Sequence, residues 1–234
     1  MHKLTTIQLK FLKKTMGVRQ ATANSFVYLE LGVLPIKYEV HKRQLSFLHH
    51  IVHLREDDPV QKVWKYQKTL PNYNNWWNGV EMLMSKYNLE MSEDEIKKMS
   101  KESFKFKVKK AIKQVAFEEL KQECQTKEKT QQISYNEFKM QPYLTILSPN
   151  LSKVIFRCRS QTLNIKHHMK YKYENNFHCR WCGISDETLQ HVVNCGSGEP
   201  VINDVQNIII SGTDIRKMKE IAERIELFLD RVEV

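Results

Sequence analysis

Along most of the chain, apolar side chains recur at every third or fourth position, which is the spacing of an amphipathic helix. The first such run predicts a helix that ends near Gly17, and a shorter helix follows from Asn24 to Leu31, where a glycine ends it. Pro35 then begins a long third helix. The predicted core-facing side chains of the first helix are Leu4, Ile7, Phe11, Leu12 and Met16.

Comparable apolar stripes predict helices over residues 60–67 and 76–87, with a turn at 71–75 between them. Ser92 and Glu95 form a capping box that begins the next helical stretch. The core-facing positions of the later helices are Phe104, Val108, Ala111, Val115 and Leu120, then Leu151, Val154, Ile155 and Cys158, then Ile215, Met218, Ala222, Ile225 and Leu229. Only seven glycines and six prolines are present, so tight turns are few and the predicted fold class is mainly α.

The most linker-like segment is 122–132 (QECQTKEKTQQ), which is polar and lacks large apolar side chains. We therefore predict a helical domain at residues 1–121, a small domain with a basic helix at 133–200, and a helical tail at 201–234. Cys124, inside the predicted linker, is expected to be an exposed or half-buried thiol.

Three of the five cysteines fall beside one histidine in the pattern Cys-x2-Cys-x8-His-x3-Cys, formed by Cys179, Cys182, His191 and Cys195. Gly183 directly after the second cysteine allows backbone amides to turn toward the sulfurs. Three thiols and an imidazole, with no carboxylate, suit one closed tetrahedral zinc site of the structural kind. The alternative is a set of buried thiols that pack in a core and hold no metal.

Two aromatic residues, Phe177 and Trp181, flank this predicted zinc knuckle. They could stack on an unpaired base or pack over the metal site, and the sequence leaves both roles open. The adjacent His167 and His168 cannot both face one ion on a regular helix, so we interpret them as part of a basic surface.

Charge is unevenly distributed along the chain, whose formal net charge is +10. Residues 1–55 carry nine Lys and Arg side chains but only two acidic ones, and residues 138–173 contain no acid at all. Lys and Arg placed on phosphates release condensed counterions, so a nucleic-acid partner explains this pattern. No apolar run approaches the length of a membrane span, and we expect no membrane partner.

The residues predicted to contact nucleic acid are mostly Lys and Arg on the predicted helices, with one aromatic residue from the knuckle. They are Lys10, Lys13, Lys14, Arg19, Lys105, Lys107, Lys109, Lys110, Arg157, Arg159, Lys166, Lys170 and Trp181. The lysines of 105–113 alternate around a helix, so for that group a merely solvated face is an open alternative.

The sequence lacks the motifs of several enzyme classes: it has no glycine-rich phosphate loop, no GxSxG and no HExxH. It also lacks a pair of aspartates after a hydrophobic strand, so we expect a protein that is not an enzyme. Cysteines without a secretory signal indicate a reducing compartment, and we predict an intracellular protein of the nucleus or cytoplasm.

Two blocks of the sequence resemble the region after the palm in non-LTR retrotransposon reverse transcriptases. The matching positions of the first block are Phe11, Gly17, Val18, Thr22, Asn24, Val27, Tyr28, Glu30, Leu31, Gly32 and Pro35. The second block, which lies within residues 135–195, is similar to the helix, Arg-bearing stretch and zinc knuckle that close those proteins.

This resemblance implies a thumb and connection at 1–121 and a knuckle-bearing domain at 133–200 that binds RNA or single-stranded DNA. It also implies that the catalytic palm would precede Met1, so polymerase activity is not carried over. Two alternatives stay open. The chain could be a zinc-stabilised interaction module with the 215–229 stripe as a dimer seam, or an accessory subunit of a retroelement polymerase encoded elsewhere.

Overall fold

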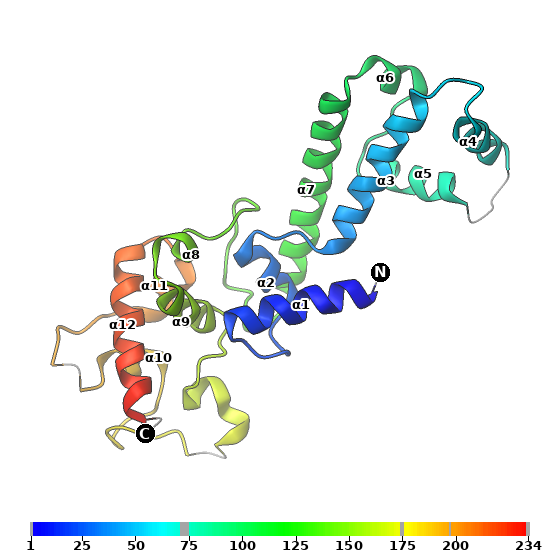
Figure 1. The fold of residues 1–234 in the computed structure, drawn as a ribbon. Coiled ribbons are helices and arrows are strands. Elements are labelled where there is room, and N and C mark those ends of the chain that lie inside the picture. The colour runs from blue at the N-terminus through cyan, green and yellow to red at the C-terminus, as the bar shows by residue number, and fades with distance from the viewer. Residues whose placement is uncertain (1, 71–74, 174–175, 197, 233–234) are drawn as a thin grey trace. The chain divides into compact units, whose positions relative to one another are not determined.

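The computed structural model describes residues 2–70, 75–173, 176–196 and 198–232. Within these ranges the secondary structure is almost entirely helical, and the strand-like pairing found is one antiparallel bridge between His178 and Asp186. The helices are α1 (His2–Met16), α2 (Asn24–Leu31), α3 (Ile36–Val52), α4 (Pro59–Thr69), α5 (Trp76–Lys86), α6 (Glu93–Lys98), α7 (Lys101–Gln125), α8 (Tyr143–Ile146), α9 (Pro149–Arg159), the 3-10 helix η1 (Lys166–Lys172), α10 (Leu189–Asn194), α11 (Val205–Ser211) and α12 (Ile215–Val232) (Figure 1). The predicted class, mainly α, is confirmed.

Local sequence signals account for where several of these helices begin. The capping box is present, since Ser92 accepts from the Glu95 amide and the Glu95 carboxylate accepts from the Ser92 amide. Asp58 caps α4, which has Pro59 in its first turn. The predicted turn at 71–75 lies outside the described residues except for Asn75, whose side chain caps α5.

The chain divides into two compact units whose bounds differ from the predicted domains. Unit 1 contains Met1–Thr5 with Leu34–Glu119, and unit 2 contains Thr6–Val33 with Leu120–Val234. Residues 6–33 therefore group with the C-terminal part of the chain. The distribution of polar residues along the sequence does not indicate this grouping.

The segment 122–132 is not a separate polar linker, because α7 continues through its first residues. Cys124 is 1% exposed, and this corrects the prediction of an exposed or half-buried thiol. The Thr130 hydroxyl donates to the Cys124 carbonyl oxygen at 3.0 Å, and Ile133 is also buried. The segment thus packs into unit 2 through its few buried side chains, while the rest of it remains polar on the surface.

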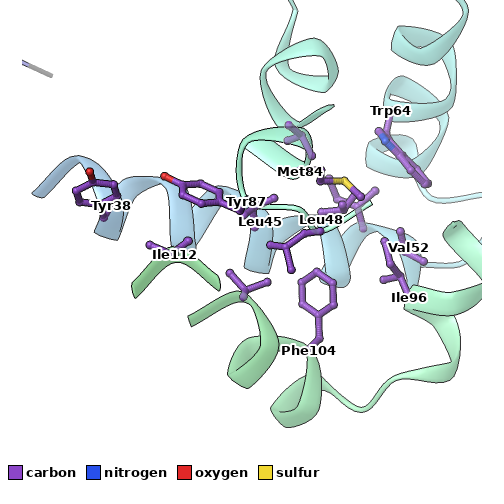
Figure 2. Packing of buried hydrophobic residues seen from close by; sticks show 14 of the residues in the cluster. Tyr38, Leu45, Leu48, Val52, Trp64, Met84, Tyr87, Ile96, Phe104 and Ile112 are labelled. Atoms are coloured by element: carbon purple, nitrogen blue, oxygen red, sulfur yellow. The ribbon is translucent and has the colours of Figure 1, made fainter. Parts of the chain in front are cut away.

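The core of unit 1 is built around one face of α3. Leu45, Leu48 and Val52 of that helix lie in one buried cluster with Phe104 and other apolar residues of α7, as Figure 2 shows. The remaining labelled members of the core are Tyr38, Trp64, Met84, Tyr87, Ile96 and Ile112. The predicted inward positions Phe104 and Val108 are buried as expected.

In unit 2, α12 packs against α9 and α10. Met218, Ala222 and Ile225 of its apolar stripe are fully buried. The face that could have been a dimer seam is therefore part of the core of unit 2, so the stripe is not a seam. The interaction module itself stays an alternative.

The first helix differs from its predicted packing. Met16 is buried, but Ile7 and Phe11 are 63% and 68% exposed, and Leu4 is also exposed. The helix is instead anchored by polar groups, because the Lys13 side chain is buried and the Tyr28 hydroxyl donates to the Gln8 side chain at 3.0 Å. The apolar spacing predicted the helix correctly and its buried face incorrectly.

A buried ion pair between Glu30 and Arg159 joins α2 to α9 inside unit 2. Arg159 donates from Nε at 3.0 Å and from Nη2 at 2.9 Å to one Glu30 oxygen, and neither side chain is more than 2% exposed. Tyr135 and Tyr143 donate their hydroxyls to the same carboxylate at 2.7 and 2.5 Å. Burial raises the pKa of both tyrosines, so they remain donors.

Candidate metal centre

Cys179 and Cys182 lie on a tight turn that is closed by the His178–Asp186 bridge. The Cys179 amide donates to the Ser185 carbonyl at 2.7 Å, which pins the two sides of the turn together. Gly183 has a φ of +67°, which L side chains rarely adopt, and its amide donates to the Cys179 carbonyl at 2.9 Å. The amide of Ile184, directly after the glycine, donates to the Cys182 sulfur at 3.5 Å, which agrees with the role predicted for Gly183.

The other two candidate ligands come from α10. Thr188 caps the helix by accepting from the His191 amide at 3.2 Å, and Cys195 directly follows the last helical residue. Leu189 and Val192 are buried and fix the helix against unit 2. His191 and Cys195, four positions apart, therefore lie on one side of α10, as predicted from their spacing.

The ligand atoms of Cys179, Cys182, His191 and Cys195 all lie within 4.8 Å of one another. The Cys179 and Cys195 sulfurs are 3.8 Å apart, and the Cys182 sulfur is 3.3 Å from His191 Nε2. A tetrahedral ion with bonds of about 2.0–2.3 Å separates its ligand atoms by roughly 3.3–3.8 Å. The four residues thus fit one metal ion in a small zinc-knuckle-like arrangement.

The electrostatics of the four side chains also favour a cation among them. The amides of Ile184 and Ser185 lower the pKa of Cys182 to about 6, so this residue is a thiolate near neutral pH. Burial and the two neighbouring cysteines raise the pKa of Cys195 to about 12. The thiols therefore oppose one another's ionisation, and a divalent cation at their centre would remove that opposition.

Glu187 connects the cysteine turn to the basic segment before it. Its carboxylate is fully buried and accepts from Arg180 Nη2 at 2.7 Å and from the Arg180 amide at 2.9 Å. It also accepts from the Lys166 amide at 3.0 Å, while the Glu187 carbonyl accepts from the His167 amide at 3.3 Å. Glu187 does not cap the helix that follows, because the Thr188 side chain provides that cap.

Trp181 packs within unit 2. A Cβ on Gly196 would come within 2.6 Å of its ring, and the Phe228 ring centroid lies 6.0 Å away. The Arg231 guanidinium lies 4.1 Å from the indole centroid. Trp181 is half-buried with its ring against these groups, so of its two open roles the structure supports packing, and its contact with nucleic acid stays a prediction.

Three predicted phosphate contacts are also corrected, because Lys13, Arg159 and Lys166 are buried. The Lys13 ammonium donates to the carbonyl oxygens of Gln20 and Thr22, both at 2.6 Å. Arg159 is ion-paired as described above, and the Lys166 ammonium lies 5.3 Å from the ring centroid of a neighbouring tyrosine. Their charges are satisfied inside unit 2 and do not face solvent.

The remaining predicted contacts lie in two groups, one in each unit. Lys10, Lys14 and Lys170 are exposed in unit 2, with Arg19 and Arg157 half-buried, and Lys105, Lys107, Lys109 and Lys110 are exposed in unit 1. Arg157 packs against Gly17, where a Cβ would come within 2.6 Å of its guanidinium. The Arg19 guanidinium donates to the Tyr171 hydroxyl at 2.9 Å and thus lies beside η1.

The two adjacent histidines of η1 have different surroundings. His167 is exposed and His168 is buried. Burial, together with the positive groups His167, Lys129 and Arg19, lowers the pKa of His168 to about 3, so this ring is neutral. His167 alone lies on the surface, and burial together with Lys170 lowers its pKa, so the two histidines add little positive charge there.

None of the helices in the described part of the chain is long and apolar enough to cross a membrane. Comparison with known proteins gives no match to a protein-family model, to a curated protein or to a solved structure. The resemblance to retrotransposon reverse transcriptases therefore stays a prediction from the two sequence blocks.

Proposed function

We propose that the chain is a zinc-stabilised nucleic-acid-binding protein that acts by binding and has no catalytic step of its own. The observation that carries this proposal is the buried Glu187, which ties the candidate metal ligands to the basic residues of η1. Three thiols and one imidazole are the ligand set that structural zinc sites use. An ion held there would fix Glu187 and, through it, the start of η1.

The surface that the ion would hold in shape consists of Arg19 together with His167, Lys170, Tyr171 and Lys172, and we call it the basic turn. All four η1 members are exposed, and residues 138–173 contain no acid. The Arg19 guanidinium lies 5.2 Å from the Tyr171 ring centroid, so a flat cationic group and an aromatic ring are placed together. Such groups stack on bases, while the lysines suit phosphates.

The same proposal includes an origin in the region after the palm of a non-LTR retrotransposon reverse transcriptase, with RNA or single-stranded DNA as ligand. Its support is the pair of sequence blocks, which cover residues 7–87 and 135–195. In that setting the chain would act beside a polymerase domain. A primer-extension assay with the chain alone is expected to give no extended primer.

Charge reversal in the basic turn is expected to weaken nucleic-acid binding. Lys170→Glu with Lys172→Glu should raise the Kd for a fluorescent single-stranded oligonucleotide by about tenfold or more, because fewer phosphates are neutralised and fewer counterions are released. The affinity of the unaltered chain should fall steeply between about 50 and 200 mM salt, and the double variant should show a shallower slope. Fluorescence anisotropy over a salt series measures both.

The matched control is Lys217→Glu with Lys219→Glu, which makes the same charge change on exposed positions of α12 in the same unit. It should alter the Kd far less than the basic-turn variant. Chelation should weaken binding of the unaltered chain to the oligonucleotide, since without the ion Glu187 would no longer hold the start of η1 in place. The proposal would be contradicted by a Kd that does not change with salt concentration, or by a Kd that both double variants raise equally.

A further inference from the structure

A groove on unit 1 runs between α3 and α7, which lie side by side in Figure 1, and has a volume of about 600 Å³. The residues that line it are Lys42, Arg43, Ser46, Phe47, His50, Lys101, Lys105 and Lys109. Two of these positions, Lys105 and Lys109, were predicted from the sequence as nucleic-acid contacts. The structure adds three basic residues from α3 and one from the start of α7, and no lining residue is acidic.

The cations of this groove are mostly without acidic partners. Lys42 pairs with Glu39 at 2.5 Å. In contrast, Arg43, Lys101, Lys105 and Lys109 make no ion pair with any residue that the structure describes. Other lysines of unit 1, such as Lys97 and Lys86, do pair with nearby glutamates. Acids are thus available in this unit, but none of them lines the groove, and Glu39 reaches it only through its pair with Lys42.

The spacing of the α7 lysines indicates the shape of a suitable partner. Lys101, Lys105 and Lys109 follow one another at intervals of four residues, or roughly 6 Å along the helix axis. Like charges at this spacing repel one another and lower the stability of a helix. A stripe of this kind is therefore not explained by the stability of α7, whereas an extended polyanion lying along the groove would offset the repulsion.

An aromatic ring lies in the same groove. Phe47 is 45% exposed although it is a large apolar residue. Its ring stacks on His50, with centroids 5.8 Å apart and an interplanar angle of 29°, and it meets Trp76 edge-on at 5.7 Å. These two neighbours hold the ring in place while leaving part of it open to solvent. A held aromatic ring among lysines suits an unpaired base whose backbone follows the cations.

We propose that this α3–α7 groove is a binding site for single-stranded nucleic acid, with the α7 lysines on phosphates and Phe47 against a base. A duplex is a poorer partner because its bases are stacked inside and cannot reach Phe47. An anionic membrane is also a poorer partner, because the ring lies in a groove and does not project from the surface. The proposal rests on the proposed function for the class of ligand, and it adds a second site that does not involve the metal ligands.

The test uses the full chain loaded with zinc and a fluorescent oligothymidylate as probe. Lys105→Glu with Lys109→Glu should raise the Kd by about tenfold and reduce the salt slope by about 1.4, because each phosphate neutralised on a single strand adds about 0.7 to that slope. Lys62→Glu with Lys98→Glu is the matched control, because both lysines are exposed in unit 1 and lie outside the groove. The control should leave the Kd within about twofold of the unaltered chain.

Phe47 tests the stacking part of the site separately. Phe47→Leu keeps an apolar side chain at the position and should raise the Kd for the oligothymidylate by roughly fivefold or more without changing the salt slope. Far-UV circular dichroism checks that the helices persist. A Kd that is unchanged in Phe47→Leu would overturn the assignment of a base to this ring.

Three further outcomes overturn the groove site. These are a groove double variant that binds like the control, a duplex of equal length that binds the unaltered chain as tightly, and poly-glutamate that competes equally well. The binding surface given under the proposed function, the basic turn, fails separately if Lys170→Glu with Lys172→Glu has no effect while the groove variants do. A chelator distinguishes the two sites further. In the unaltered chain it should leave the groove able to bind the oligothymidylate, and this remaining binding should be abolished in Lys105→Glu with Lys109→Glu.

Discussion

Removing the metal is expected to unfold the part of the chain around residues 175–200. Zinc binding to peptides with such ligands releases on the order of 10–16 kcal/mol, which is comparable to the whole stability of a domain, about 5–15 kcal/mol. Apart from α10, the described residues of this segment are turns joined by few backbone hydrogen bonds. Cys182→Ser should have the same effect as chelation, because a hydroxyl is a poor zinc ligand.

Hydrogen exchange with and without a chelator measures this prediction. The amides of Cys179 and Glu187 donate hydrogen bonds within the cysteine turn, and they should lose protection when the metal is removed. The Lys166 amide should follow, since its acceptor is the Glu187 carboxylate. Elemental analysis should find one zinc ion per chain.

The control is Cys158→Ala, which removes a buried thiol that is not among the candidate ligands. It should lower the stability of unit 2 through a small cavity and leave the zinc content unchanged. Burial raises the pKa of Cys158, so this thiol stays protonated and does not compete for the metal. Full helicity and full protection of residues 176–196 without metal would show that the ion is not structural.

Features of this fold that depend on neighbouring residues in the chain could be predicted from the sequence. The capping box at Ser92 and the turn at Gly183 are local, because the partner groups lie within four positions. The four candidate metal ligands lie in one short segment, so their spacing along the sequence was enough to predict that their ligand atoms lie close together. For the same reason, the ends of α1 and α2 at glycines, the start of α3 after Pro35 and the start of α6 after Ser92 followed from the sequence.

Features that depend on distant partners could not be predicted. Lys13 is on a basic helix and was predicted to contact a phosphate, but it is buried and donates to carbonyl oxygens of the following loop. Arg159 lies among exposed basic residues in the sequence, and its partner Glu30 is 129 positions away. The apolar spacing of α1 cannot tell which side faces a core, because the elements that would cover it are not encoded in the helix itself.

Replacing Glu30 is expected to have the second largest effect on stability. Glu30→Gln leaves the Arg159 guanidinium buried without its counter-charge, and breaking a buried pair in this way costs about 3–5 kcal/mol. The loss should be largest in unit 2, because the same carboxylate accepts from Tyr135 and Tyr143 and the Arg159 guanidinium also donates to the carbonyl of Ile210. Urea unfolding followed by circular dichroism measures the change, and hydrogen exchange locates it at α2 and α9.

A double variant separates the charge imbalance from the loss of packing. Glu30→Gln with Arg159→Met removes both charges, so it should be more stable than Glu30→Gln alone even though it changes more atoms. Asp57→Asn is the surface control, since the Arg55–Asp57 pair is 85% and 64% exposed and should contribute less than about 1 kcal/mol. If Glu30→Gln unfolds at the same urea concentration as Asp57→Asn, the pair does not hold α2 to α9. Residues 6–33 would then be joined to the C-terminal part of the chain by apolar contacts and by other hydrogen bonds, such as those from Arg19 to Tyr171 and from the Gln141 amide to the Glu30 carbonyl.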